Sequence, residues 1–320
     1  MSTEFRTHTL ELTENEAGRR LDQALASLLP QYSRQRLQAW IEAGKVRLDG
    51  RVPRSKDKVL GGEQVHIEVE LLPEVTLTAE TAPVDVVYED KALRVINKPA
   101  GLVVHPGAGN PAHTLQNMLL GLDPKLALVP RAGLIHRLDK DTSGLMVVAR
   151  TLEAHTALTE LLAGHEIQRR YIAVCTGVMT GGRTVDEPIG RHRTARIKMQ
   201  VRGDGREAVT HFRVLQRFRG HTQVQAQLET GRTHQIRVHL AHIGYPVAGD
   251  PVYGTRKRYP PGSTPELRAA LDGFRRQALH AAELEFAHPV SGKPLSFTAP
   301  LPDDLQGLLR VLAADAADPA

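Results

Sequence analysis

Five charged or protonatable side chains lie within the six residues 136–141, after an apolar approach at 134–135 and before a short apolar strand pattern at 145–149. Asp139 follows Leu138 at the entry to that strand, where a rigid scaffold would hold its carboxylate at the mouth of a sheet. A carboxylate in such a place can act as a nucleophile or as a general acid or base. The opposing interpretation is an ordinary solvated turn, which is what a charged loop between two strands usually is.

Two other chemistries deserve comparison with a single nucleophilic carboxylate. Asp139 and Asp141 would share one face of an extended strand and could form the acid/base pair of a glycosidase, but the Thr-Ser-Gly that follows favours a turn. His234, His239 and His242 could suggest a metal site. Only the last two share a helix face, and no His-Glu-x-x-His pattern occurs. We therefore predict no metal site.

The string His-Arg-Leu-Asp-Lys-Asp-Thr-Ser-Gly at residues 136–144 resembles the signature of the RluA-type pseudouridine synthases. Three further segments are similar to other motifs of that family, and the resemblance covers nearly the whole chain. They comprise residues 97–107, residues 167–174, and residues 228–242 with the Gly-Asp-Pro-Val-Tyr-Gly string at 249–254.

This resemblance implies an isomerase that breaks the uracil–ribose bond of a uridine, turns the base and joins its C5 to the same sugar carbon. The reaction needs no redox change and no external reactant, so no cofactor is expected. By resemblance Asp139 is the nucleophile, and whether it attacks the sugar or the base stays open. Arg237 matches the cation that keeps this carboxylate ionised. Tyr171 is the third catalytic residue and would pack on the base and help to move a proton, with a core tyrosine as its alternative. Arg137 would fill the space that the extruded uridine leaves.

A basic stretch near the N-terminus indicates an RNA-binding surface. Residues 34–58 hold eight basic and three acidic side chains, a net charge of +5. Helix patterns precede and enter this stretch, and Asp49-Gly50 is typical of a tight turn between two short extended runs. The segment resembles the alpha-L RNA-binding domain of a small-subunit ribosomal protein and its relatives. We expect RNA contacts from the following residues: Arg34, Arg36, Lys45, Arg47 and Arg51.

A second basic stretch at residues 191–219 holds nine basic and two acidic side chains, and its first half reads as an exposed hairpin loop. Two separate positive patches favour an extended polyanion over a nucleotide. Aromatic residues make up only 4% of the chain, which argues against a stacking platform and favours recognition of a folded RNA. The resemblance implies large-subunit (23S) ribosomal RNA or its precursor particle as partner, hence a role in rRNA modification and ribosome biogenesis. The alternative is a ribosome-associated RNA-binding protein without activity.

The elements that must position these residues indicate two domains. Apolar spacing predicts a helix from Leu21 that Pro30 ends, and a second one capped by Ser33 and Gly44. Further helices are predicted over 152–163 and around residues 305–312, and strands at 6–12, 65–69, 86–88, 93–96, 145–149, 171–174, 223–228, 284–286 and 295–297. We therefore predict an α+β chain: an alpha-L RNA-binding domain at 13–70, a linker at 71–85, and a pseudouridine synthase domain at 86–312 on a mixed, largely antiparallel sheet with flanking helices. The tail 313–320 should be frayed.

Composition excludes several classes of protein. The chain has 320 residues, enough for two domains, and a net charge of +5. Its one cysteine, Cys175, rules out an intrachain disulfide and any cysteine-cluster metal site. No apolar run is long enough to cross a membrane, and the N-terminus lacks an apolar signal core. We expect a cytoplasmic protein that acts as a monomer.

Overall fold

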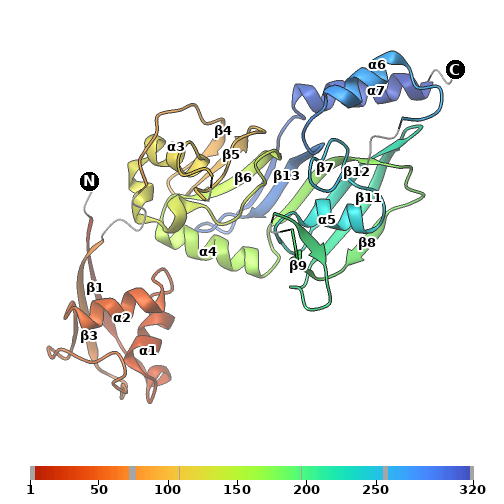
Figure 1. The fold of residues 1–320 in the computed structure, drawn as a ribbon. Coiled ribbons are helices and arrows are strands. Elements are labelled where there is room, and N and C mark those ends of the chain that lie inside the picture. Colours follow the sequence, from red (N-terminus) through yellow and green to blue (C-terminus); the bar gives the residue numbers. More distant parts are fainter. Residues whose placement is uncertain (1–3, 72–76, 108, 196, 255–258, 318–320) are drawn as a thin grey trace.

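The computed structural model describes residues 4–71, 77–107, 109–195, 197–254 and 259–317 (Figure 1). Its N-terminal part is a three-stranded antiparallel sheet in the order β1-β3-β2, covered by two helices. Alternating buried residues of the strands and the apolar faces of the helices form one core. The elements are β1 (Glu4–Glu11), α1 (Leu21–Leu28), α2 (Arg34–Glu42), β2 (Val46–Leu48) and β3 (Gln64–Leu71), with a 3-10 turn, η1, at Glu14–Glu16.

Local signals in the sequence explain how these elements begin and end. The Ser33 side chain accepts a hydrogen bond from the Arg36 amide and caps α2, as predicted. Asp49 and Gly50 both have positive φ, and the backbones of Leu48 and Arg51 exchange hydrogen bonds across them. The tight turn is therefore confirmed, but the predicted strand after it is wrong, because β2 pairs with β3 and residue 51 forms only an isolated bridge.

A nine-stranded mixed sheet forms the rest of the molecule, in the order β4-β5-β6-β13-β7-β12-β11-β8, with β14 added beside β13. Within the described residues, β6 and β13 are its one parallel pair, so the α+β prediction of a largely antiparallel sheet is confirmed. The strands are β4 (Val86–Glu89), β5 (Leu93–Lys98), β6 (Ser143–Ala149), β7 (Gln168–Thr176), β8 (Arg183–Asp186), β11 (Val209–Arg217), β12 (His221–Leu228), β13 (Leu279–Ala287) and β14 (Pro294–Thr298).

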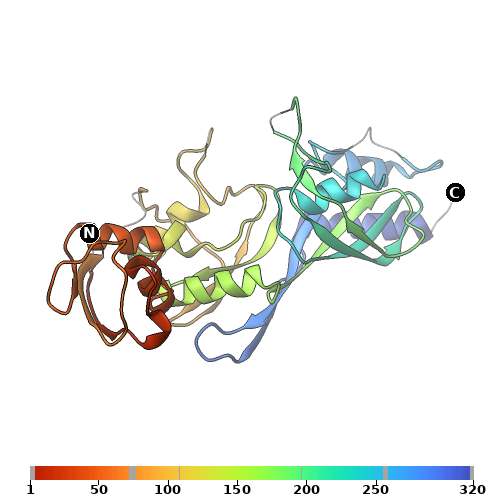
Figure 2. The same ribbon diagram turned by 90° about the horizontal axis from the view of Figure 1, so that it is seen from below.

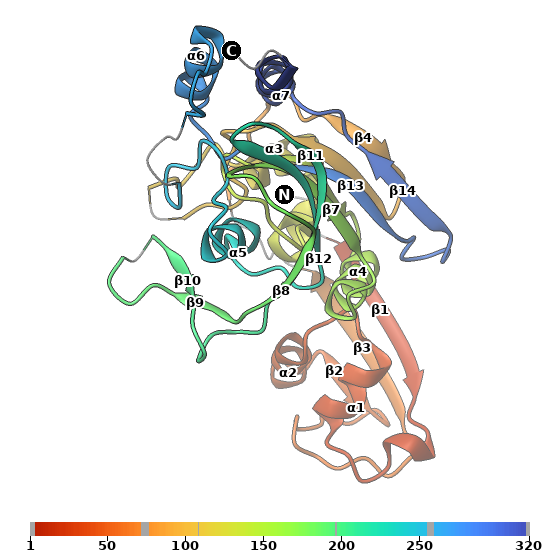
Figure 3. The same cartoon turned by 90° about the vertical axis from the view of Figure 1, so that its right-hand side faces the viewer.

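Helices flank this sheet, and a separate hairpin of β9 (Ile189–Arg191) and β10 (Met199–Val201) projects beside α5 (Figure 3). The helices are α3 (Leu115–Leu122), α4 (Leu152–Ala163), α5 (Gln235–His242), α6 (Pro265–Gly273) and α7 (Asp303–Ala317), with 3-10 segments η2 (Pro124–Leu128) and η3 (Pro130–Gly133). Helix α4 has the predicted bounds. Helix α7 extends to Ala317, so the predicted fraying of residues 313–317 is wrong, and residues 318–320 lie outside the described part.

The N-terminal unit lies against α4 and the segment before it (Figures 1 and 2). Arg6 and Glu153 form an ion pair at 3.1 Å between nitrogen and oxygen, and Leu128 and Leu152 pack into the N-terminal core. Part of the segment predicted as a linker, from residue 77 onward, packs against helix α3 of the larger unit. The side chain of Asn117 in α3 donates to the Thr78 carbonyl at 2.8 Å, and the backbone amide of Glu80 donates to the Asn117 carbonyl. We propose that the catalytic unit starts near residue 77.

Close contact between β6 and β13 fixes the loop that carries Asp139. Gly144 has φ +114°, and a Cβ atom there would lie 2.2 Å from the carbonyl oxygen of Ala281 in β13. Only glycine permits this approach. The prediction of a turn in place of a strand at Asp139 and Asp141 is confirmed, since the Thr142 amide donates to the Asp139 carbonyl across residues 139–142. Its extension through Thr-Ser-Gly is wrong, because Ser143 and Gly144 already begin strand β6.

Candidate active site

A cavity of about 750 Å³ opens between the loop before β6, strand β7 and the segment that joins β12 to α5. The 134–139 loop contributes Asp139 and Arg137, β7 contributes Tyr171, and the start of α5 contributes Arg237. These four residues, which the sequence separates by up to 100 positions, therefore line one space. The volume lies within the range of pockets that hold small organic ligands.

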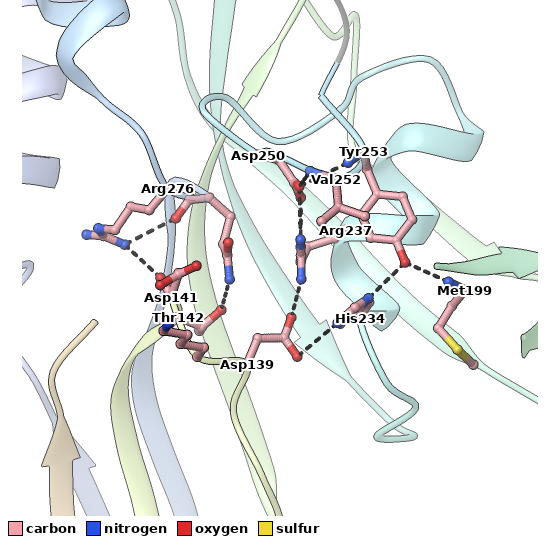
Figure 4. A network of polar contacts seen from close by, with 12 residues as sticks. Asp139, Asp141, Thr142, Met199, His234, Arg237, Asp250, Val252, Tyr253 and Arg276 are labelled. Carbon is pink, nitrogen blue, oxygen red and sulfur yellow. Dashed lines mark hydrogen bonds and ion pairs between the residues drawn. The ribbon is translucent and has the colours of Figure 1, made fainter. Parts of the chain in front are cut away.

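Asp139 and Arg237 form an ion pair, with 2.8 Å between the Asp139 Oδ2 and Arg237 Nη1 atoms (Figure 4). The aspartate side chain is 15% exposed and the arginine side chain 4%. Burial alone would lower the pKa of Arg237, but the carboxylates of Asp250 and Asp139 outweigh it and raise that pKa. The guanidinium therefore stays charged beside the carboxylate.

Asp250 fixes the other edge of the same guanidinium, with contacts of 2.7 Å to Nε and 2.9 Å to Nη2 of Arg237. Its Oδ1 atom also accepts hydrogen bonds from the amides of Val252 and Tyr253. Burial raises the pKa of Asp250, but the hydrogen bonds from Arg237 and its charge more than offset this and leave the pKa lowered. Sequence reasoning missed this role, although Asp250 belongs to the Gly-Asp-Pro-Val-Tyr-Gly string.

His234 and Tyr253 complete the network around the aspartate (Figure 4). The Tyr253 hydroxyl accepts a hydrogen bond from the Met199 amide at 2.8 Å and lies 2.8 Å from His234 Nδ1. The other ring nitrogen of His234, Nε2, lies 3.8 Å from Asp139 Oδ1. Burial lowers the pKa of His234, against the influence of Asp139, and favours the neutral imidazole. The tyrosine ring also lies under the guanidinium of Arg237, 5.1 Å from its central carbon.

Tyr171 lies on the cavity floor and is only 5% exposed. Burial raises the pKa of its hydroxyl, so the side chain is a neutral phenol near pH 7. Arg137, by contrast, is exposed while it lines the same cavity, a position from which a side chain can reach a large ligand. The contacts of Tyr171 with a base and of Arg137 with the vacated space in the RNA stay predictions.

Lys98 is a buried cation that sequence reasoning also missed. Its ammonium donates to three backbone carbonyls, those of Pro99, Leu102 and Lys140, at 2.8 to 2.9 Å. Lys140 follows Asp139 directly, so Lys98 ties the loop that carries Asp139 to the end of β5. Burial lowers the pKa of Lys98 to about 7. The signal in the sequence was the Asn-Lys-Pro string that follows an apolar strand.

The predicted RNA contacts of the N-terminal unit lie away from this cavity. The Arg34 guanidinium donates to the buried carboxylate of Asp22 at 2.7 and 2.9 Å, although its side chain remains 45% exposed. Arg36 is half-buried on α2. The remaining three side chains are exposed on and around β2: Lys45, Arg47 and Arg51.

The histidines considered for a metal site and the two aspartates considered for a glycosidase pair do not form a common site. His239 is buried and its ring contacts the Thr210 hydroxyl and the Glu187 carbonyl, while His242 is exposed. In the part of the chain that the structure describes, no group of three metal-ligating side chains gathers. Asp141 is not among the residues that line the cavity, so it does not face Asp139 across a substrate site. Across the same described ranges, no helix is both long and apolar enough to pass through a membrane.

Comparison with known proteins gives two family matches: an RNA pseudouridylate synthase model covers residues 92–242, and an S4 domain model covers residues 19–65. The ribosomal large subunit pseudouridine synthase D of Xanthomonas campestris pv. campestris is 55% identical over 304 residues, covering 95% of this chain and 92% of that protein. The protein of the same name from Escherichia coli K12 is 53% identical over 308 residues, covering 96% and 94%.

Two solved human structures share the fold of most of this chain. Human RNA pseudouridylate synthase domain containing 4 superimposes with a TM-score of 0.55 at 28% identity, covering 72% of this chain and 93% of that one. Human RNA pseudouridylate synthase domain containing 1 superimposes with a TM-score of 0.53 at 24% identity, covering 74% and 97%, and supports the fold alone.

Proposed function

The chain belongs to the RNA pseudouridylate synthase family, and from that premise we propose that it converts specific uridines of large-subunit (23S) ribosomal RNA to pseudouridine with Asp139 as nucleophile. Family membership confirms the predicted enzyme class and the RNA-binding domain at the N-terminus. The names of its relatives support the choice of large-subunit RNA.

One observation carries the catalytic assignment: a carboxylate that is mostly buried, paired with a guanidinium at 2.8 Å, faces a cavity beside a buried tyrosine. The reaction breaks the N1–C1′ bond of uridine, forms a C5–C1′ bond, and exchanges the C5 proton for one on N1. An ionised Asp139 can begin this by attacking C1′ or by adding to the uracil ring. Both routes require the anion, which Arg237 stabilises.

We assign Arg237 and His234 to positioning of that anion. Asp250 holds Arg237 on the side away from Asp139, so the guanidinium presents one N–H to the nucleophile in a fixed direction. The Nε2 atom of His234 lies 3.8 Å from the second carboxylate oxygen. Together they would keep Asp139 in one orientation while the base turns, which is the preorganisation that a two-stage reaction needs.

Tyr171 and Arg137 would handle the uridine itself. The Tyr171 ring is buried at the floor of the cavity and would pack against the uracil. The exposed Arg137 would occupy the gap in the RNA once the nucleotide has left its stack.

The S4 domain would add affinity rather than chemistry. Its exposed cations at residues 45, 47 and 51 lie outside the cavity and can contact phosphates of the same RNA. The hairpin of β9 and β10, which carries several basic residues and projects beside α5 (Figure 3), would supply a second contact.

The test uses the full-length chain, unmodified large-subunit rRNA, and chemical mapping of pseudouridine. Asp139→Asn should abolish product formation, by at least about 1,000-fold, while RNA binding persists. Asp141→Asn is the matched control, and it should keep most of the activity, whereas a glycosidase-like acid/base pair would need both carboxylates. Wild-type protein that binds the RNA but forms no pseudouridine would establish the non-catalytic alternative. Residual turnover of Asp139→Asn within tenfold of wild type would refute the nucleophile.

A further inference from the structure

Arg169 is a buried cation of the cavity that the proposed mechanism does not use. It lies on β7, two residues before Tyr171, and only 5% of it is exposed. Its Nη2 atom donates to the Glu229 carbonyl at 3.2 Å, and its buried Nε atom has no hydrogen-bond partner. Among the residues that the structure describes, no carboxylate forms an ion pair with it.

Its neighbour Arg170, in contrast, forms ion pairs with carboxylates of the same sheet. Arg170 lies on the opposite face of β7 and contacts the carboxylates of Glu283 and Glu285 at 2.9 Å. The surface arginine is thus neutralised, while the buried one is not. A buried charge without a counter-ion is unfavourable for folding, and burial accordingly lowers the pKa of Arg169.

A second donor without an acceptor lines the same cavity. His136 Nε2 accepts a hydrogen bond from the Val147 amide at 3.2 Å, so the ring proton resides on Nδ1, which is buried and has no partner. Burial, followed by the charge of Arg169, lowers the pKa of His136 to about 3 and keeps the ring neutral. Two residues that line the cavity, Arg169 and His136, thus each have a buried N–H with no acceptor in the described part of the chain.

Space beside the guanidinium is kept open by Gly231, where a Cβ atom would lie 2.8 Å from Arg169 Nη1. The cavity as a whole has an excess of positive charge, because five arginines and only two carboxylates line it. The arginines are Arg131, Arg137, Arg169, Arg232 and Arg237, and the carboxylates are Asp139 and Glu229.

We propose that Arg169 binds a phosphate group of the target RNA strand, directly next to the uridine that enters the cavity. A phosphate carries the full negative charge that balances a buried guanidinium, whereas the carbonyl oxygens of uracil are neutral. Guanidinium and phosphate also match in geometry. The inference rests on the proposed function, since it assumes that an RNA strand enters this cavity. It adds the anchor that would fix the sugar of the target nucleotide relative to Asp139.

The experiment measures the affinity of full-length protein for short RNA with a neutral methylphosphonate at each phosphate flanking the target uridine. Wild type should lose about 10- to 100-fold in affinity at one of these positions, the range expected for a hydrogen bond to a charged group. Arg169→Met should lose as much on ordinary RNA and nothing further on that modified RNA. Arg170→Met is the matched control and should remain as sensitive to the modification as wild type.

Two results would overturn the proposal. If the losses from Arg169→Met and from the methylphosphonate multiply at both positions, the arginine does not bind either phosphate. The second result concerns RNA whose target uracil carries a 2-thio or 4-thio substitution. If this substitution changes the affinity of wild type but not that of Arg169→Met, the arginine contacts the base.

Thermal unfolding separates a binding role from a structural one. Without RNA, Arg169→Met should unfold at the same temperature as wild type or higher, because it removes an unpaired buried charge. Unfolding more than about 5 °C lower would indicate a structural role and refute the proposal.

The test of the phosphate contact does not depend on catalysis, because the effect of the methylphosphonate on wild type is measured as RNA affinity alone. An absence of pseudouridine in the wild-type reaction would therefore refute the proposed function without deciding the phosphate contact.

Discussion

Replacement of Asp250 by asparagine tests a residue that contacts Arg237 but does not line the cavity. Asp250 is fully buried and forms two of the three ion-pair contacts of Arg237 at this site. Removal of one partner from a buried pair costs about 3–5 kcal/mol of unfolding free energy. For a domain of this size, about 3 kcal/mol corresponds to a fall in Tm of roughly 6–12 °C. Arg237 would then keep its ion pair with Asp139 and its contact with the Tyr253 ring, and a displacement of about 1 Å at Asp139 costs roughly 100-fold in rate.

The assay combines thermal unfolding with single-turnover pseudouridine formation at saturating RNA, at a temperature where both proteins are folded. Glu285→Gln is the control, since it breaks an exposed ion pair with Arg170 and should change stability by no more than about 1 kcal/mol. Because the pKa of Asp250 is lowered in the folded state, its contribution exists above pH 4 and disappears as the pH falls through the folded value. Full activity of Asp250→Asn, together with a lower Tm, would show that Arg237 keeps its orientation unaided and would refute this reasoning.

Three further outcomes follow from the same geometry. Tyr253→Phe keeps the ring under the guanidinium but removes the hydroxyl between the β9–β10 hairpin and α5, so kcat should fall about 2- to 10-fold at unchanged RNA affinity in single-turnover assays. Burial lowers the pKa of Lys98 to about 7 from 10.5 in the unfolded chain, so the unfolded chain binds more protons between these pH values. The free energy of unfolding should therefore rise with pH across that window, and denaturant unfolding of Lys98→Met should lose this dependence. Alanine at the three exposed cations near β2 should flatten the slope of log affinity against log salt by about 2 while kcat at saturating RNA stays unchanged. The three positions are Lys45, Arg47 and Arg51.

Local elements were readable from the sequence because their causes lie within a few residues. The apolar spacing of residues 152–163 predicts helix α4 with its observed bounds, and Ser33 caps α2 through a side chain three residues away from its partner. The Asp49-Gly50 turn needs only two residues with positive φ. Such features depend on backbone geometry and local hydrogen bonds, which neighbouring residue types determine.

The sequence was misread where a distant segment decides the local structure. Gly144 looked like part of a turn, but the carbonyl of Ala281, 137 residues later, is what requires glycine inside β6. The C-terminal residues 313–317 are low in sequence complexity and were therefore predicted to be frayed. They continue α7, whose apolar face packs into the main core.

The sequence by itself determined the motifs of the site, and through their resemblance it predicted Asp139 as the nucleophile and Arg237 as its partner. Only the tertiary structure decided how those side chains are held: Asp250 contacts the far edge of Arg237, Lys98 contacts the loop that carries Asp139, and Arg169 has no counter-ion among the described residues. The physical reason is that these properties depend on which charges are buried together. Ion pairs such as Arg237–Asp139 join residues 98 positions apart, and the presence or absence of a partner at such a separation is set by the packing of strands and helices, not by local sequence.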